Sequence, residues 1–309
     1  MKEIKNVLIC GAGMMGKGLA QIFSGSEDIH VTVQNRRDRG VHDAVRENLE
    51  QLRDKGIITD AEIEARLSRI TFTLDKHSDE VKNADLVIEC VAEEMATKQD
   101  LFAELEDICR PDCIFATNTS VMSVTEIASK CKKRDRVVGA HFWNPAFLIP
   151  LVEVVKTEET SEEAAQMTMD VLRKVGKKPV LCKKDVPGFI ANRMQHALWR
   201  EAISIVEHGI ADAKTVDEAV KYSFGLRLPQ LAPMENSDMV GLQLTYNIHE
   251  YVLKHLEDSH EPSPILKELM AEGKMGFSTG EGFQKWSEED IANSKKGLNE
   301  YLIKMIYGV

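Results

Sequence analysis

A glycine-rich motif close to the N-terminus constrains the fold of this chain more than any other feature. Residues 11–16, Gly-Ala-Gly-Met-Met-Gly, follow the pattern G-x-G-x-x-G. An apolar run over 7–10 predicts a buried strand before the motif, and residues 15–24 predict a helix after it. In that setting the glycines permit a tight turn, the close approach of a pyrophosphate and close helix–strand packing. A glycine turn without a ligand is the weaker alternative. The motif therefore predicts a dinucleotide site at Gly11, Gly13, Met14, Met15 and Gly16.

The pattern along the rest of the chain predicts two domains. Further strands are expected over 31–34, 86–90, 114–117, 137–141, 151–155 and 180–182, and helices over 43–55 and 60–67. This alternation predicts an α/β fold with a Rossmann-like, mainly parallel sheet covered on both faces. After Pro187-Gly188 the pattern is helical, over 190–208, 215–222, 239–256, 265–272 and 288–306. We therefore expect an NAD(P)-binding domain over 1–186 and an all-helical C-terminal domain over 187–309.

The residue that ends the second predicted strand bears on the choice of cofactor. Sites specific for NAD usually have Asp or Glu there, which binds the ribose 2′-OH. This chain has Asn35, followed by Arg36 and Arg37. A neutral side chain does not repel a 2′-phosphate, and an adjacent guanidinium can bind one. The sequence predicts that Asn35 and Arg36 contact the cofactor and that NADP is accepted or preferred; a solvated basic turn is an equally favoured alternative.

Charge and composition argue against several classes of partner. The formal net charge is −11, whereas nucleic acids and anionic membranes are bound by a surplus of Lys and Arg. No run approaches the roughly 20 apolar residues of a membrane span, and the N-terminus lacks the pattern of a signal peptide. The six cysteines form no CxxC pair, which predicts reduced thiols, no metal site and a cytoplasmic location. We expect no nucleic-acid or membrane partner.

Four polar residues lie where a sheet protein rarely places them without a function. Ser120 follows the strand 114–117 and His141 ends the strand 137–141. Both therefore lie at carboxyl ends of strands, where open α/β sheets bind ligands. Glu153 lies inside an apolar strand, where a carboxylate is costly unless it is paired, and a histidine is its natural partner. Asn192 lies at the start of the first long helix of the second half. Taken singly, Ser120 and Asn192 have an ordinary explanation as helix caps, and His141 has one as a core histidine.

Together these residues belong to a series of segments that resembles one enzyme family. The segments are Asn118-Thr119-Ser120, His141-Phe142-Trp143-Asn144-Pro145, Leu151-Val152-Glu153-Val154 and Pro187-Gly188-Phe189-Ile190-Ala191-Asn192-Arg193. In order, spacing and identity they resemble the signatures of the L-3-hydroxyacyl-CoA dehydrogenases, including the bacterial 3-hydroxybutyryl-CoA dehydrogenases. The resemblance extends over nearly the whole chain, through Glu93, Lys98, Pro233, Asp238 and residues 279–283.

The resemblance implies an oxidoreductase of fatty acid metabolism that interconverts a 3-hydroxyacyl and a 3-oxoacyl group by hydride transfer to NAD(P). It implies that His141 is the general base for the hydroxyl proton and that Glu153 orients and polarises it. Ser120 and Asn192 are expected to contact the substrate near the reacting oxygen. The ribose and nicotinamide end of the cofactor is expected to be lined by Glu93, Lys98 and Asn118. The helical domain is implied to close over a small acyl substrate and to form a homodimer.

Several departures from the family pattern concern the CoA part of the substrate. The helix 43–55 carries Glu47, Glu50 and Asp54 where the family often has lysines near the CoA phosphates. Residues 286–309 extend past the usual family end as an extra helix, and Pro150 and Leu231-Ala232-Pro233 replace common family residues. A dehydrogenase of the same family acting on a non-CoA hydroxy acid or alcohol is therefore the alternative. A catalytically silent nucleotide-binding relative is less favoured, because the set of four polar residues is intact.

Overall fold

The computed structural model describes residues 3–309, which divide into two compact units. The first unit comprises residues up to Arg193 together with Asn299–Val309, and the second comprises Met194–Leu298. The chain passes from one unit to the other inside two helices, α8 (Ala191–Glu207) and α14 (Glu288–Tyr307). The boundary predicted at 186/187 lies just before the first of these passages. The return of residues 299–309 to the first unit was not predicted.

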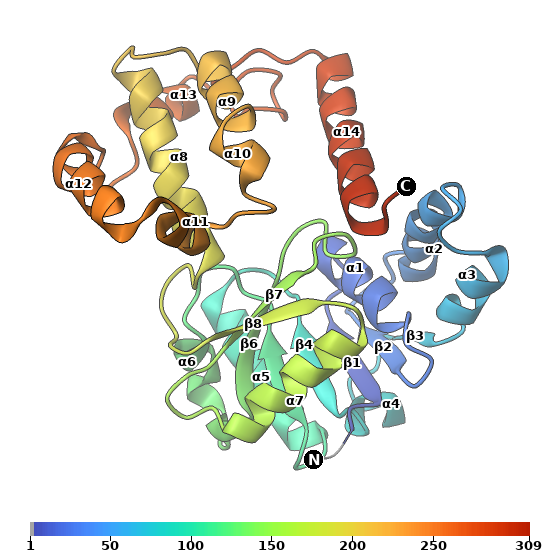
Figure 1. Ribbon diagram of the computed structural model, residues 1–309. Helices are drawn as coiled ribbons and strands as arrows, with labels where there is room; N and C mark the ends of the chain where they lie inside the picture. The colour runs from blue at the N-terminus through green and yellow to red at the C-terminus, as the bar shows by residue number, and fades with distance from the viewer. Residues whose placement is uncertain (1–2) are drawn as a thin grey trace. The chain divides into compact units, whose positions relative to one another are not determined.

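An eight-stranded sheet forms the centre of the first unit (Figure 1). Its strands are β1 (Asn6–Cys10), β2 (His30–Gln34), β3 (Ile70–Thr73), β4 (Leu86–Glu89), β5 (Ile114–Thr117), β6 (Val137–Phe142), β7 (Leu151–Val155) and β8 (Lys178–Cys182). They lie in the order β3-β2-β1-β4-β5-β6-β7-β8, and every pair is parallel except β6 with β7. This order confirms the predicted Rossmann-like, mainly parallel sheet.

Helices of the first unit cover both faces of this sheet. They are α1 (Met14–Phe23), α2 (Val41–Arg53), α3 (Asp60–Leu67), α4 (Asp79–Lys82), α5 (Met95–Ile108), α6 (Val124–Ile127) and α7 (Glu162–Lys174), with short 3₁₀ turns over 128–130 and 134–136. Side chains alternate between the faces of a strand. Val7 and Ile9 of β1 therefore join one apolar cluster with α1, α2, α3 and α7, and Leu8 joins a second cluster with α4, α5 and α6.

Neither β3 nor the helices α4, α5, α6 and α7 were predicted from the sequence. The strand β3 has only four residues, of which Ile70 alone is buried, so its apolar pattern is short. The buried face of α7 consists largely of small or polar residues, including Ala164, Ala165 and Thr168.

The strand order positions a ligand site. From β1 the chain adds β2 and then β3 toward one edge of the sheet. It then returns to the other side of β1 with β4 and adds the later strands toward the opposite edge, so the order reverses between β1 and β4. In open α/β sheets the crevice at the carboxyl ends of the strands, at such a reversal, binds ligands. The glycine motif follows β1 directly and therefore lies at this crevice.

The second unit is helical. It contains most of α8, then α9 (Ala213–Lys221), α10 (Phe224–Arg227), α11 (Pro233–Val240), α12 (Leu242–Val252), α13 (Pro264–Ala271) and the first half of α14, with a 3₁₀ turn over 253–255. The single helix predicted over 239–256 is wrong. Gly241 has φ +94° and separates α11 from α12, because a residue in that conformation cannot continue a right-handed helix.

The helical unit buries almost none of its own apolar side chains. Val216 is the only buried residue between 194 and 298, a range that the structure describes completely. Within residues 3–309, no helix is both long and apolar enough to cross a membrane.

Candidate active site

The predicted phosphate-binding turn has the geometry that a dinucleotide needs. Gly11 has φ +113°, and a Cβ there would lie 2.5 Å from the carbonyl oxygen of Cys90. A Cβ on Gly16 would lie 1.9 Å from the carbonyl oxygen of Gly11. Both glycines are therefore required by the protein's own packing. Gly13 differs, because a Cβ there would meet no atom within 4 Å.

The open space beside Gly13 fits a cofactor. Gly13 is the N-cap of α1 and provides no side-chain cap, so the first N–H groups of the helix are available to a phosphate. A hollow of about 600 Å³ adjoins this turn and is lined in part by Gly13, Met14, Lys17 and Arg39. The residues present thus suit a pyrophosphate-containing cofactor, with Met14 and Met15 opening the helix.

The turn after β2 offers polar groups of two kinds. The side-chain nitrogen of Asn35 donates a hydrogen bond of 2.7 Å to the carbonyl oxygen of Arg37, which leaves the side-chain oxygen as an acceptor. Arg36 is exposed. Arg39, rather than Arg36, lines the hollow, and so does Lys17. Sequence reasoning missed both of these cations, although their signal was present as basic residues close to the glycine motif.

A buried ion pair lies at the carboxyl end of β4, the strand next to β1. Lys98, which is 1% exposed, donates to both carboxylate oxygens of Glu89 at 2.8 and 2.9 Å. It also lies 3.0 Å from a carboxylate oxygen of Glu93. Thr117 donates to Glu89 at 2.7 Å. Glu89 was missed at the sequence level, although it ends an apolar strand and satisfies the same criterion that identified Glu153.

Glu93 connects this ion pair to the loop that carries Ser120. It accepts hydrogen bonds from the hydroxyl of Thr119 and, at 3.2 Å, from the backbone N–H of Ser120. Burial acts to raise the pKa of Glu93, but the bonds from Thr119 and Lys98 outweigh it, and the net pKa is lowered. Glu93 is therefore an ionised acceptor at the surface of the crevice.

His141 and Glu153 form a buried pair. The antiparallel register of β6 and β7 places them directly opposite each other. His141 Nδ1 lies 2.8 Å from Glu153 Oε2, and the two residues are 4% and 0% exposed. The rings of Trp143 and Phe189 lie 5.4 and 5.8 Å from the imidazole ring, centroid to centroid. The pairing inferred from the cost of burying a carboxylate is present in the structure.

Four N–H groups surround the Glu153 carboxylate. Oε1 accepts from the backbone N–H groups of Ile190 and Ala191, both at 2.9 Å, and Oε2 also accepts from the indole of Trp143 at 3.3 Å. Burial acts to raise the pKa of Glu153, but the bonds from His141 and from the start of α8 outweigh it, and the net pKa lies below the usual value. Glu153 is therefore an ionised partner for the imidazole.

The remaining predicted residues lie around this pair. Asn118 accepts a hydrogen bond of 2.8 Å from the backbone N–H of Phe142, beside His141. Asn192 donates to the carbonyl oxygen of Ser120 at 3.2 Å. The fold thus connects, through neighbouring strand ends and the start of α8, the four residues that the sequence singled out. Within residues 3–309, no cluster of three or more His, Cys, Asp or Glu side chains is arranged to hold a metal ion.

Comparison with known proteins identifies the family that this fold and site define. Residues 6–186 match the NAD binding domain of 3-hydroxyacyl-CoA dehydrogenase, and residues 188–286 match its C-terminal domain. The chain therefore belongs to the 3-hydroxyacyl-CoA dehydrogenase family. It is an NAD-dependent oxidoreductase of the type that acts on CH–OH groups, which confirms the predicted fold, family and enzyme class.

Two relatives and one solved structure illustrate the range of the family. A probable 3-hydroxybutyryl-CoA dehydrogenase of Deinococcus radiodurans is 36% identical over 282 residues, covering 90% of this chain and 99% of its own. The human mitochondrial hydroxyacyl-coenzyme A dehydrogenase is 36% identical over 294 residues, covering 92% and 91%. The crystal structure of a 5-formyl-3-hydroxy-2-methylpyridine 4-carboxylic acid 5-dehydrogenase, described as an NAD⁺-dependent dismutase, superposes with a TM-score of 0.88 at 29% identity, covering 99% of both chains.

Proposed function

We propose that the protein oxidises a 3-hydroxyacyl group to a 3-oxoacyl group, or catalyses the reverse reduction, with His141 as the general base. The observation that carries this proposal is the buried 2.8 Å contact between His141 and the ionised Glu153 at the carboxyl end of β6. Glu153 accepts a hydrogen bond from Nδ1–H, so the neutral imidazole keeps Nε2 free to accept the hydroxyl proton. A general base positioned in this way contributes about 10²–10⁴-fold to the rate.

The other residues of the site position the reacting groups. NAD, when bound, supplies the hydride acceptor. The turn at Gly11, Gly13 and Gly16 suits its pyrophosphate, and Glu93 and Asn118 are proposed to line its ribose and nicotinamide end. Lys98 is buried and is proposed to act there through Glu93, which it holds in place. Ser120 and Asn192 are proposed to contact the substrate beside His141; the hydrogen bond between them supports this assignment, because it fixes the loop and the helix start at one place.

Substitution of the base tests the reaction. His141→Gln is expected to lower kcat at least about 10²-fold with little change in the affinity for NAD, measured by reduced-cofactor absorbance and by cofactor fluorescence. A variant that retains more than about a tenth of the wild-type rate contradicts the role of general base.

We also propose that the enzyme accepts NADP. The free side-chain oxygen of Asn35 suits the ribose, and exposed Arg36 and Arg39 can offer charge-assisted donors to a 2′-phosphate. The test compares kcat/KM for the two cofactors in the wild type and in Arg36→Ala and Arg39→Ala. A strong native preference for NAD that neither substitution changes refutes this assignment.

A second candidate substrate is a small hydroxy acid, alcohol or aldehyde without CoA. The superposition on the pyridine-carboxylate dehydrogenase includes the C-terminal extension, which lies beyond the matched family domain. The arginines of α2 already face carboxylates: Arg46 binds Glu64, and Arg53 binds Asp54 and Asp60. These pairs leave less positive charge for CoA phosphates. A kcat/KM for acetoacetyl-CoA far above that for free acetoacetate and for aromatic aldehydes eliminates this candidate.

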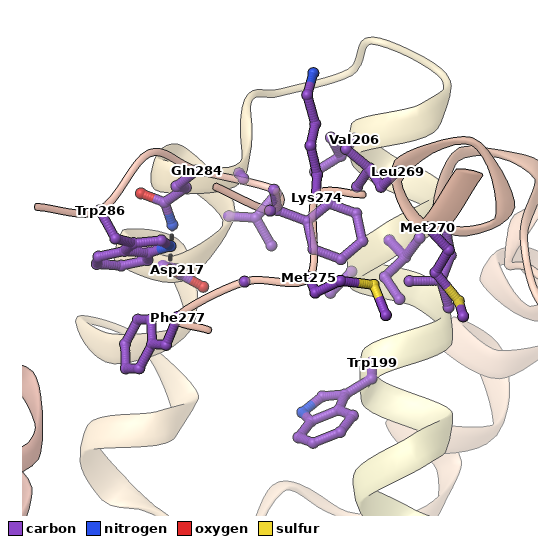
Figure 2. A pocket seen from close by; sticks show the side chains of 18 residues that line it. Trp199, Val206, Asp217, Leu269, Met270, Lys274, Met275, Phe277, Gln284 and Trp286 are labelled. Carbon is purple, nitrogen blue, oxygen red and sulfur yellow. Dashed lines mark hydrogen bonds between the residues drawn. The ribbon is translucent and has the colours of Figure 1, made fainter. Parts of the chain in front are cut away.

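We propose that the helical unit pairs with a second copy of the chain. Its apolar side chains lack cover: Tyr222, Leu244 and Tyr251 are 79%, 51% and 74% exposed. A pocket of about 610 Å³ in the same unit is walled by aromatic and methionine side chains, including Trp199, Met270, Phe277 and Trp286 (Figure 2). Exposed apolar surface on this scale marks an interface.

Sedimentation velocity tests the dimer. The wild type is expected to sediment as a dimer and Leu244→Glu as a smaller or aggregating species, because a charge at a buried interface is unpaired. A wild-type monomer at micromolar concentration overturns the proposal.

The cytoplasmic location stays a prediction, supported by six cysteines that are all free thiols.

A further inference from the structure

A second cavity lies in the first unit, away from the cofactor turn and the catalytic pair. Its volume is about 290 Å³. We call it the α1–α14 cavity, and its defining residues are Gln21, Leu52, Arg66, Phe147, Lys177 and Tyr307. It is walled by α1, α2, α3, the loop before β7 and the turn between α7 and β8, and the last turn of α14 closes part of it.

One wall carries a buried acceptor that lacks a donor. Gln21 is 3% exposed, and its side-chain oxygen has no hydrogen-bond partner among the described residues, 3–309. Buried polar atoms are nearly always hydrogen-bonded, since an unpaired one loses its interaction with water without replacement. The oxygen itself is enclosed by protein atoms, but Gln21 lines the cavity, so rotation of its side-chain amide about the last torsion brings the oxygen to a donor located there.

The charge of the lining favours an anion. The charged residues around the cavity are Arg66, Lys174 and Lys177, and no Asp or Glu lines it. Lys174 is paired with Glu3 and Asp28, and Lys177 donates to the carbonyl oxygens of Ala146 and Ile149. The Arg66 guanidinium, in contrast, makes no ion pair or hydrogen bond within residues 3–309, although the charge of Glu62 and the hydroxyl of Tyr307 interact with it electrostatically. It is the cation of the cavity that is available to a ligand.

The rest of the lining is apolar. Leu52, Phe147, Leu148, Val175 and Ile306 contribute side chains, and Leu52 and Leu148 are 3% and 2% exposed. A small ion such as phosphate leaves these walls uncovered, whereas an aromatic or branched body covers them. The volume lies at the lower end of the range for ligand pockets and suits a ligand of one ring.

The α1–α14 cavity is separate from the cofactor site. The cofactor hollow is lined near Gly13 and Met14, and none of its residues lines the cavity. At about 1.5 Å per residue, Gln21 lies roughly 10 Å along α1 from Met14. The residues of α14 that close the cavity also lie beyond residue 286, where the match to the family domain ends. The cavity therefore depends on the C-terminal extension of this chain.

We propose that the α1–α14 cavity is a second ligand site that binds a small aromatic carboxylate carrying a hydroxyl or amine donor. Its carboxylate pairs with Arg66, its ring packs against Leu52 and Phe147, and its donor bonds to the Gln21 side-chain oxygen. This site goes beyond the dehydrogenase function proposed above and does not require it.

Titration calorimetry of the full-length protein tests the site with four probes. They are 4-hydroxybenzoate, benzoate, which lacks the donor, 4-hydroxybenzyl alcohol, which lacks the charge, and inorganic phosphate. The variants are Gln21→Leu and Arg66→Met. The matched control is Arg173→Met, which removes an exposed guanidinium of α7 that does not line the cavity. Thermal melting and NAD binding of each variant establish that it is folded, and Arg66→Lys retains the charge if Arg66→Met does not fold.

We expect 4-hydroxybenzoate to bind once per chain, with or without saturating NAD, and benzoate to bind about tenfold more weakly, the effect of one hydrogen bond to a buried acceptor. Gln21→Leu removes this difference, and Arg66→Met weakens both carboxylates at least about tenfold. Failure of every probe at about 10 mM, a range in which one-ring ligands bind, overturns the proposal. So do equal losses in Arg66→Met and Arg173→Met, competition with NAD, or phosphate binding as tight as that of 4-hydroxybenzoate.

Discussion

Replacing Glu153 by glutamine removes the charge beside His141 and exchanges one acceptor oxygen for an NH₂ donor, with little change in size. All four groups around the carboxylate are N–H donors, two on Oε1 and two on Oε2. An amide has only one acceptor atom, so its NH₂ must face two of these donors. If the oxygen stays on the N–H groups at the start of α8, the NH₂ points at His141 Nδ1. The neutral imidazole then accepts at Nδ1 and carries its proton on Nε2, where it cannot act as a base.

We therefore expect a large loss of kcat in Glu153→Gln. In the serine-protease triad, neutralising the carboxylate behind the histidine forces the wrong tautomer and lowers kcat about 10⁴-fold. For the variant Glu153→Gln we expect kcat for hydroxyl oxidation to fall between about 10² and 10⁴-fold, which corresponds to about 3–5.5 kcal/mol of lost transition-state stabilisation. KM for NAD is expected to change little, because none of the residues proposed to bind the cofactor contacts Glu153.

The assay follows reduced-cofactor absorbance at saturating substrate over a range of NAD concentrations, which gives kcat and the KM for NAD separately. Glu106→Gln is the matched control. Glu106 also accepts from two backbone N–H groups, those of Lys132 and Lys133, and pairs with Arg136, far along the chain from the site. It is expected to lose stability but to keep kcat.

Two results refute this reasoning. One is a kcat of Glu153→Gln within tenfold of the wild type, below the smallest usual contribution of a positioned base. The other is a KM for NAD that rises as much as kcat falls, because a general defect of the fold affects both constants. Equal loss of activity in Glu106→Gln assigns the effect to destabilisation of the fold.

Three further expectations concern other charged groups. Asn35→Asp is expected to shift the ratio of kcat/KM for NADP over NAD at least about tenfold toward NAD, because a carboxylate repels the 2′-phosphate; an unchanged ratio contradicts the role of this turn. Glu89→Gln is expected to lower the free energy of unfolding by about 3 kcal/mol in denaturant titration, since Lys98 stays buried with one carboxylate fewer; a loss below about 1 kcal/mol contradicts this. Burial lowers the pKa of Lys177 from 10.5 to about 8, so the unfolded chain holds that proton more tightly than the native protein. The free energy of unfolding is therefore expected to gain about 3 kcal/mol relative to Lys177→Met as pH rises from 8 to 10.5, and parallel stability–pH curves for the two proteins refute this.

The parts of the site that follow from local chemistry were predictable from the sequence. The glycine turn was recognisable because its neighbours specify a strand and a helix, and Glu153 was recognisable because a lone carboxylate in an apolar strand requires a partner. The same rule applied to Glu89 identifies its partner Lys98, but only the fold shows that both are buried together.

Features set by long-range packing were not predictable in this way. Antiparallel pairing of β6 with β7 decides that His141 faces Glu153, and no local pattern reports the direction of a neighbouring strand. The helix break at Gly241 was missed because apolar residues continue on both sides of it. The return of α14 to the first unit depends on Ile303, whose burial in the core of that unit is a tertiary contact.

The two carboxylate oxygens of Glu153 connect the imidazole of His141 to the start of helix α8. Its Oε2 serves His141, while its Oε1 anchors the start of α8, which continues unbroken beyond residue 193 into the second unit. N–H···O hydrogen bonds form at about 2.7–3.2 Å, so a displacement of the helix start by about 1 Å breaks both bonds to Oε1. The carboxylate that orients the imidazole is therefore held by the same residues that begin the helix running into the second unit.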